Sequence, residues 1–190
     1  MLEHRNFLDQ LSELDHPQNV ERGGLRVAAV RDRGLLLLQV SRQDSSLDAS
    51  LRAQLGIGAP EPLRASVGDN YALLWLAPGE CLLELPKSET LTCAAALTGR
   101  FVLTLAAVTD VSDALASFDI NGDRVAEVLM TGCSLDLHSE AFEPDRVART
   151  VFAGIPTIVW KRAVHQFRCL SDRSHAGHLW NWFCEKPSSW

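Results

Sequence analysis

Three acidic or amide side chains alternate in a way that could begin a calcium-binding loop. Asp119, Asn121 and Asp123 are spaced like the first ligands of such a loop. A complete loop needs Gly directly after the third ligand and Glu at the twelfth position, where this chain has Arg124 and Met130. We therefore interpret the segment as a turn leading into a helix from Arg124 to Met130, with Asp123 as its N-cap.

A second group contains imidazoles and a thiol that could ligate a metal. His175 and His178 would share one helical face, and Cys184 follows two turns later. A metal site needs a further ligand of fixed geometry, and His138 and His165 are the remaining candidates. Nothing in the sequence brings these residues together. We therefore favour a surface or core role for the histidines.

Cysteine nucleophiles are the third possibility. Cys133 lies five residues before His138, but a catalytic cysteine usually meets its base through the fold rather than along the chain. The chain has no C-x-x-C pair, and an odd number of dispersed cysteines is typical of buried free thiols. The cysteines are Cys81, Cys93, Cys133, Cys169 and Cys184.

Motifs that hold nucleotides or activate a nucleophile are absent from the sequence. The chain has no G-x-G-x-x-G, no phosphate loop, no G-x-S-x-G and no H-E-x-x-H. The sequence therefore predicts no catalytic, cofactor-binding or metal-binding set of residues, and we expect the chain not to be catalytic alone.

Composition narrows the possible classes of function further. The 190 residues include 18 basic and 24 acidic side chains, a formal net charge of -6, and 46% are hydrophobic. This balance disfavours binding to nucleic acid or to an anionic membrane surface. The N-terminus lacks the pattern of a secretory signal, and the apolar runs are too short to span a bilayer. We expect a cytoplasmic protein.

The elements that would position these residues alternate between strands and helices. Hairpins are expected around Asp32-Arg33-Gly34 and Ala77-Pro78-Gly79-Glu80, and Pro156 should separate two strands. The predicted strands are Leu25–Arg31, Leu35–Val40, Tyr71–Leu76, Cys81–Leu85, Val102–Leu105, Val108–Ser112, Ala114–Ile120, Thr150–Ile155, Thr157–Lys161 and Val164–Leu170. The predicted helices are Phe7–Leu14, Ser45–Leu55, Ser88–Leu97, Arg124–Met130 and Ser174–Cys184.

These elements predict an α+β fold with mainly antiparallel sheets and packed helices. We find no repeat with a period of about 20–50 residues. The chain is expected to form an N-terminal half, residues 1–105, and a C-terminal half, residues 106–190, or one intertwined domain.

Tryptophans are concentrated at the C-terminal end of the chain, where four of the five lie from residue 160 onward. On a helix, Trp180 and Trp182 point about 200° apart, so both cannot face one core. Large aromatics on a surface suggest an interface with a partner. We predict such an interface at Trp180, Trp182 and Trp190, the alternative being that these rings wrap back onto their own domain.

The order of segments in the chain resembles a known family. The resemblance is dense from about Asp69 to Phe183 and includes a Leu74–Leu83 segment that is similar to the family's "W-L-G-P-D-E-W-L-L", with Gly79 and Cys81 as departures. The other segments are Asp110-Val111-Ser112, Asn121-Gly122-Asp123, Gly132–His138, Ala141–Pro144, Ala148–Pro156 and Asp172–Trp182. Together they resemble the gamma subunit of heterotetrameric sarcosine oxidase.

The resemblance implies a fold related to part of the folate-binding aminomethyltransferases and a role inside a complex. In that complex a flavin oxidises the N-methyl group of sarcosine, yielding glycine, hydrogen peroxide and formaldehyde or 5,10-methylenetetrahydrofolate. FAD, FMN, NAD and tetrahydrofolate belong to the alpha and beta subunits of the family, and zinc to the delta subunit. The resemblance therefore implies a cofactor-free accessory chain whose partners are the alpha, beta and delta subunits.

Two alternatives stay open at this point. The chain could be a gamma-type subunit of a related N-methyl amino acid dehydrogenase, because the substrate pocket lies on another subunit. It could also be a free-standing folate or one-carbon-binding module, by analogy of fold alone. Within the resembling segments, Gly154-Ile155-Pro156 could shape a strand bend, and Arg149 or Arg173 could serve an ion pair rather than a ligand.

Overall fold

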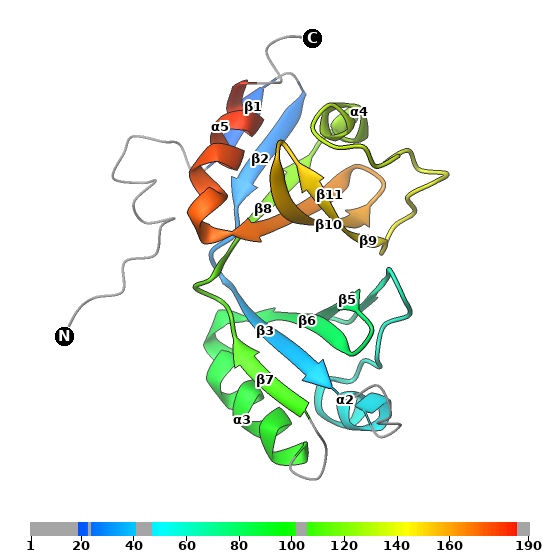
Figure 1. Ribbon diagram of the computed structural model, residues 1–190, viewed down its shortest axis with the longest axis vertical. Coiled ribbons are helices and arrows are strands. Elements are labelled where there is room, and N and C mark those ends of the chain that lie inside the picture. Colours follow the sequence, from blue (N-terminus) through cyan, green and yellow to red (C-terminus); the bar gives the residue numbers. More distant parts are fainter. Residues whose placement is uncertain (1–18, 23, 41–46, 102–105, 186–190) are drawn as a thin grey trace, which may run out of the picture. The chain divides into compact units, whose positions relative to one another are not determined.

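The computed structural model describes residues 19–22, 24–40, 47–101 and 106–185, and confirms the predicted α+β class (Figure 1). The predicted helix Phe7–Leu14, the predicted strand Val102–Leu105 and Trp190 lie outside this range. The strands are β1 (Asn19–Arg22), β2 (Leu25–Ala29), β3 (Arg33–Val40), β4 (Ala65–Val67), β5 (Ala72–Ala77), β6 (Glu80–Pro86), β7 (Ala106–Asp110), β8 (Leu115–Asn121), β9 (Val147–Phe152), β10 (Ile155–Ala163) and β11 (Gln166–Asp172). The helices are α2 (Leu47–Leu55), α3 (Thr90–Arg100), α4 (Val125–Met130) and α5 (Ala176–Glu185), and short 3-10 turns η1 (Lys87–Glu89) and η2 (Arg173–His175) precede α3 and α5.

The chain divides into two compact units, each built on one antiparallel sheet. Unit 1 comprises Met1–Arg31, Asp113–Pro144 and Arg149–Trp190, and its sheet has the strand order β1-β2-β8-β11-β10-β9. Unit 2 comprises Asp32–Ser112 and Asp145–Ala148, and its sheet has the order β4-β5-β6-β3-β7.

The two units repeat the same arrangement of elements. The segment β3-α2-β4-β5-β6-η1-α3 of unit 2 corresponds to β8-α4-β9-β10-β11-η2-α5 of unit 1, and the sheet neighbours agree in order. Even single hydrogen bonds recur: Lys87 N donates to Asp32 O, and Arg173 N donates to Ala114 O, at the same junctions. We call residues at matching positions in the two sheets counterparts.

The strand that precedes each repeat in the sequence belongs to the sheet of the other repeat. β2 leads into β3 along the chain but pairs with β8, and β7 leads into β8 but pairs with β3. The predicted hairpin around Asp32-Arg33-Gly34 is therefore wrong, because both of its strands have distant partners. The predicted halves 1–105 and 106–190 also differ from the two units, since this exchange carries β2 across the expected boundary.

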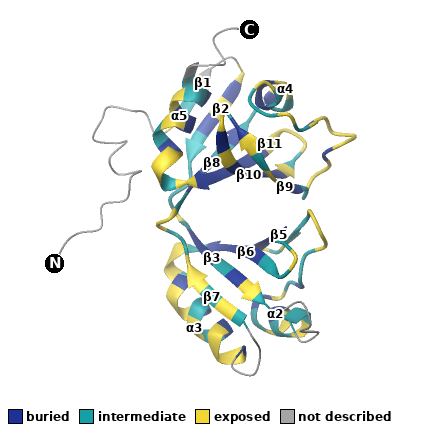
Figure 2. Cartoon of the chain, in the orientation of Figure 1, coloured by how far each residue is buried: buried dark blue, intermediate teal, exposed yellow. Residues whose placement is uncertain are grey.

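Unit 2 has a core made mainly of leucines. Leu36, Leu38 and Leu83 project from one face of the sheet and pack with Leu51 of α2 and Leu97 of α3. The alternating side chains of β3 and the helical spacing of α2 and α3 bring these residues to one layer. Figure 2 accordingly shows that β5 and β6, in the middle of this sheet, are mostly buried, whereas the edge strand β7 and the outer side of α3 are largely exposed.

The core of unit 1, between its own sheet and helices, is mainly aromatic. Phe118 of β8 lies 6.0 Å from the ring of Trp180 and 5.9 Å from that of Phe183, measured between ring centroids. Phe152 of β9 packs 4.7 Å from Trp182 in an edge-on arrangement. A β-carbon on Gly132 would come within 2.9 Å of both Phe152 and Trp182, so only glycine leaves room for these rings.

Local turns follow the sequence predictions in one hairpin and depart from them in another. The β5–β6 hairpin turns at Gly79, whose φ is 80°, as predicted from Pro78-Gly79. Pro156, however, lies inside β10, and the chain reverses earlier at Ala153 and Gly154, where φ is 51° and 82°. Both residues adopt a left-handed conformation suited to a tight hairpin, so the expected strand break at Pro156 is wrong.

Candidate functional site

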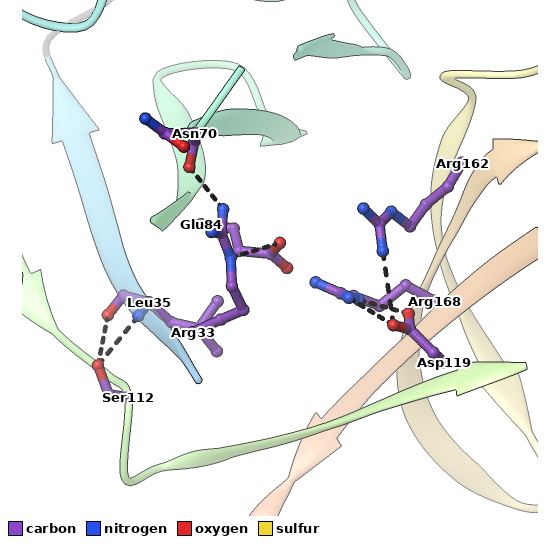
Figure 3. Close-up of polar contacts among 8 residues, drawn as sticks. All are labelled: Arg33, Leu35, Asn70, Glu84, Ser112, Asp119, Arg162 and Arg168. Atoms are coloured by element: carbon purple, nitrogen blue, oxygen red, sulfur yellow. Dashed lines mark hydrogen bonds and ion pairs between the residues drawn. The ribbon is translucent and has the colours of Figure 1, made fainter. Parts of the chain in front are cut away.

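The acidic group that resembles a calcium loop is an ion pair on a strand. Asp119 and Asn121 both belong to β8, and the Asp119 carboxylate accepts hydrogen bonds from Arg168 Nε at 2.8 Å and Nη2 at 2.7 Å (Figure 3). Arg162 Nη1 lies 3.5 Å from the same carboxylate. The negative charge is thereby neutralised by arginine, and Arg124, not Asp123, occupies the N-cap position of α4 without a side-chain capping bond.

The predicted metal candidates do not converge. His175 ends η2, His178 lies on α5, and His178 Nε2 is 3.2 Å from the carbonyl oxygen of Ala153. His138 lies in the loop after α4, and His165 in the turn between β10 and β11. Within the described part of the chain, no group of three or more His, Cys, Asp or Glu residues could hold a metal ion.

Burial disfavours a nucleophilic role for the cysteines. Desolvation raises the pKa of the Cys133 thiol, and Cys133 Sγ donates to the carbonyl of Leu129 at 3.6 Å instead of contacting His138. Burial also raises the pKa of Cys81 to about 11 and that of Cys169 still further. A nucleophilic thiolate needs a lowered pKa, so these thiols are protonated at neutral pH. None of the five cysteines forms a disulfide, and three of them are buried and two half-buried.

The tryptophans of α5 behave differently from one another. Trp180 is 1% exposed and packs into the aromatic core, so its prediction as an interface residue is wrong. Trp182 is half-buried over Phe152 and keeps part of its surface open. The helical geometry separates the two rings as predicted, but the ring that points inward is decided by the packing of α5 on β8.

The sheet face opposite the helices differs in chemistry between the two units. In unit 1 this face carries the Asp119–Arg168 pair, and the guanidinium carbons of Arg162 and Arg168 lie 5.2 Å and 6.0 Å from the Trp160 ring centroid. Trp160 and Arg168 are 2% and 3% exposed. A buried charge is tolerated only when it is paired in this way, and the arginines also stack on the ring.

In unit 2 the corresponding face carries Leu35, Leu82 and a second ion pair. Arg33 Nε donates to Glu84 Oε1 at 3.2 Å, and Arg33 Nη2 donates to the carbonyl of Asn70 at 2.6 Å (Figure 3). At the same end of the sheet, Tyr71 donates its hydroxyl proton to Glu89 at 2.7 Å. That hydrogen bond raises the pKa of the Tyr71 phenol.

Two Asp-x-Ser segments within the resembling sequence form the same local structure. The carboxylate of Asp110 accepts from Ser112 N at 2.9 Å and Oγ at 2.6 Å, and Asp172 accepts from Ser174 N at 2.8 Å and Oγ at 2.6 Å. Ser112 Oγ also accepts from Leu35 N at 2.9 Å, which ties the chain before β8 to β3 (Figure 3). Both segments therefore shape junctions. The bond from the Ser174 hydroxyl lowers the pKa of Asp172.

Unit 1 contains a surface hollow of about 440 Å³ at the end of β8, β10 and β11. Apolar side chains of Leu115, Ile158 and Leu170 contribute to its floor, and Arg149 and His175 lie at its mouth. The remaining lining residues are Thr150, Pro156, Thr157, Ser171, Asp172 and Ser174. Sequence patterns singled out Arg149, Pro156 and His175, but missed the leucines, because only strand pairing brings β8 and β11 together.

Comparisons with known proteins agree with this fold. Residues 40–189 match the family described as "Sarcosine oxidase, gamma subunit family". The "Sarcosine oxidase subunit gamma" of Corynebacterium sp. (strain U-96) is 30% identical over 142 residues, which cover 74% of this chain and 68% of the relative. That of Arthrobacter sp. is 29% identical over 143 residues, which cover 72% of this chain and 68% of the relative.

Solved structures are similar over nearly the whole chain. A chain of heterotetrameric sarcosine oxidase from Corynebacterium sp. U-96, in complex with pyrrole 2-carboxylate, has a TM-score of 0.85 and 26% identity, and the match covers 98% of this chain and 96% of that one. The glycine cleavage system aminomethyltransferase T from Bartonella henselae has a TM-score of 0.65 at 13% identity, covering 94% of this chain and 56% of that one, and shares the fold alone.

Proposed function

Because the chain belongs to the sarcosine oxidase gamma subunit family, we propose that it is the accessory gamma subunit of a sarcosine oxidase complex. The observation that carries the proposal is the full-length similarity to a chain of a heterotetrameric sarcosine oxidase, which covers 98% of this chain and 96% of the other. A chain that aligns from end to end with one subunit of an assembly is expected to occupy the same place in its own assembly.

The proposed complex converts sarcosine, water and oxygen into glycine, formaldehyde and hydrogen peroxide, or passes the one-carbon unit to tetrahydrofolate. We assign FAD, FMN, NAD, tetrahydrofolate and zinc to the partner subunits and no cofactor to this chain. Two observations support that assignment: the Asp119 carboxylate is paired with Arg168, and burial raises the pKa of the Cys133 thiol. These groups stabilise the chain rather than react.

The proposed partners are the alpha, beta and delta subunits of the complex. Trp182 remains a candidate contact because part of its ring is open, whereas Trp180 is enclosed by its own unit. Five cysteines without a disulfide are compatible with the reducing cytoplasm, which we propose as the location. No helix in the described residues is long and apolar enough to cross a bilayer.

Reconstitution tests this function directly. The chain would be co-expressed with the alpha, beta and delta subunits, and the same subunits would be prepared without it as the matched control. We expect one four-subunit species by size-exclusion chromatography, with sarcosine-dependent hydrogen peroxide release, and a loss of assembly or turnover when the chain is omitted.

Two other outcomes would contradict the proposal. Sarcosine turnover by the isolated chain would make it an enzyme in its own right, and failure to associate with the three subunits would remove the accessory role. Replacing sarcosine by N-methylglutamate distinguishes a related dehydrogenase, and calorimetric titration of the isolated chain with tetrahydrofolate tests the free-standing folate module.

A further inference from the structure

The hollow of unit 1 has a counterpart position in unit 2 that is filled by the chain itself. Leu115, Leu170 and Pro156 line the hollow. The register of the paired strands makes Arg33 the counterpart of Leu115, Glu84 that of Leu170 and Asn70 that of Pro156. In unit 2 the Arg33 side chain reaches both of the other two, so that it covers this end of the sheet. The same fold therefore leaves the position covered in one unit and open in the other.

The second bridge of unit 2 is also missing from unit 1. Tyr71 and Glu89, joined by a 2.7 Å hydrogen bond, have Thr157 and His175 as counterparts, and both of these line the hollow. Thr157 donates its hydroxyl proton to the carbonyl of Ile155 at 3.0 Å, on its own strand. Replacement of a phenol by a threonine removes most of a large side chain from this position.

The residues lining the hollow favour an occupant that is uncharged and largely apolar. No carboxylate replaces Glu84, because Leu170 stands at its position, and Leu115 stands in place of Arg33. The hydroxyls of Ser171 and Ser174 donate to the carbonyl and the carboxylate of Asp172. Polar small-molecule sites present convergent polar groups, whereas these donors are already used within the chain.

Exposed apolar surface adjoins the hollow, and the charged groups lie at its mouth. Val151, two residues after Arg149 on β9 and therefore on the same side of that strand, is 59% exposed. The mouth carries two charged side chains, Arg149 and Asp172, together with the imidazole of His175. A guanidinium packs well on an aromatic ring, as Arg162 does over Trp160 at 5.2 Å in the same sheet.

Accepting the proposed function as the starting point, we propose that this hollow receives an aromatic side chain of a partner subunit in the sarcosine oxidase complex. The ring lies on Leu115, Ile158 and Leu170, with Arg149 at its edge. Aromatic anchors in such pockets dominate the affinity of protein interfaces because they bury much apolar surface with few rotatable bonds. The hollow, rather than Trp180, is then the anchoring position of unit 1.

The test fills the hollow with the side chains that fill its counterpart. The double variant Leu115→Arg/Leu170→Glu places the Arg33–Glu84 pair at the counterpart positions of β8 and β11. Pro156→Arg independently obstructs the mouth from an exposed position. The matched control is Val164→Arg, which adds the same charge at a 53% exposed site in the turn at the opposite end of β10 and β11. Affinity for the assembled alpha, beta and delta subunits is measured by titration, and each variant chain is melted alone.

We expect both hollow variants to bind the other subunits at least about tenfold more weakly, while the control stays within about twofold. The Pro156→Arg chain should melt like Pro156→Ala, which loses the same constraint of proline on the unfolded chain. Wild-type affinity in both hollow variants overturns this proposal but leaves the proposed function intact. A melting temperature of the isolated Pro156→Arg chain clearly below that of Pro156→Ala overturns it as well, because a segment of the chain itself then fills the hollow. Failure of the wild-type chain to assemble removes the proposed function and this proposal together.

Discussion

The two units of this chain have the same order of elements and hydrogen-bonded neighbours, yet they are held together by different side chains. In unit 2 the layer between sheet and helices is built from leucines such as Leu36 and Leu97. In unit 1 the counterparts of these two residues are Phe118 and Phe183, whose rings lie 5.9 Å apart. The comparison teaches that alternating burial along the strands and helical spacing define the unit, whereas the identity of the apolar side chains is free to vary.

The face opposite the helices differs more strongly. The cross-strand pair Leu37–Leu82 of unit 2 is replaced in unit 1 by Asp119–Arg168, at the same position of the ladder. Conversely, the charged pair Arg33–Glu84 of unit 2 is replaced by Leu115 and Leu170. The units thus place their ion pairs at different positions, and the hollow of unit 1 follows from that difference.

The largest expected effect tests the aromatic core of unit 1. Trp180→Ala should lower the free energy of unfolding of the isolated chain by about 4 kcal/mol, because it opens a cavity beneath Phe118. Trp180→Phe is the matched variant and should retain most of the stability, since the indole N–H of Trp180 has no hydrogen-bond partner among the described residues. Urea unfolding measures both variants. A loss below about 1 kcal/mol for Trp180→Ala would mean that this ring is not part of the core.

The buried ion pair of unit 1 can be exchanged for the apolar pair of unit 2. Arg168→Leu alone should cost about 3 kcal/mol, because it leaves the Asp119 carboxylate without its main partner in a site that is only 25% exposed. The double variant Asp119→Leu/Arg168→Leu copies Leu37 and Leu82 and should recover most of that loss. Denaturant unfolding of the two single variants and the double variant gives the coupling. Additive losses would indicate that the two positions do not act as a pair.

A glycine in β3 tests the contact between strand and helix in unit 2. A β-carbon on Gly34 would overlap the hydroxyl of Thr90, whereas the counterparts Ala116 and Ala176 are both alanine. Gly34→Ala should therefore cost about 2 kcal/mol in the wild-type background and much less in the Thr90→Ala background. Thermal unfolding of the single variants and the double variant measures this rescue. Equal costs in the two backgrounds would contradict the overlap.

The smallest expected effect concerns Lys161, the counterpart of Trp75. Lys161 is 1% exposed, its ammonium lies 5.4 Å from the centroid of Phe167, and burial lowers its pKa below the usual 10.5. Lys161→Met should leave the free energy of unfolding unchanged or raise it by up to about 1 kcal/mol, because it removes the cost of burying a charge. A loss larger than about 1 kcal/mol would show that the ammonium stabilises the fold.

The same lysine predicts a pH dependence. Between the lowered pKa and 10.5 the folded chain binds fewer protons at Lys161 than the unfolded chain does, so the contribution of this residue to stability rises with pH. The difference in unfolding free energy between Lys161→Met and wild type should therefore shrink as pH increases through this window. Unfolding curves from neutral pH to pH 10 measure it, and a difference that grows would reverse the assigned direction.

Local features of the fold were accessible from the sequence, and remote pairing was not. The β5–β6 hairpin follows from Pro78-Gly79, because a two-strand turn depends on a few adjacent residues. The same reasoning predicts a hairpin at Asp32-Arg33-Gly34, where it is wrong, because β2 pairs with β8 and β3 pairs with β7, both far along the chain. The duplication is also invisible in the sequence, since counterparts such as Leu82 and Arg168 share a position and not a residue type.

The candidate site likewise combines residues that the sequence pointed to and residues that it did not. The residues at its mouth stand out in the sequence for other reasons: Arg149 lies in a segment that resembles the family, Pro156 is expected to separate two strands, and His175 is a metal candidate. Its floor is made of leucine and isoleucine that any buried strand contains. Only the pairing of β8 with β11, and of β11 with β10, brings Leu115, Leu170 and Ile158 together.

By itself the sequence determined the α+β class, most of the helices and strands, the likeness to the gamma subunit family, and the 200° separation of Trp180 and Trp182 on one helix. These properties depend on the period of the apolar pattern and on the order of segments, both of which are local. Tertiary structure decided which strands pair, that Trp180 faces inward, that Asp119 binds arginine, and that one unit keeps an open hollow where the other is closed. Those outcomes depend on contacts between residues far apart in the chain, whose energies no local pattern contains.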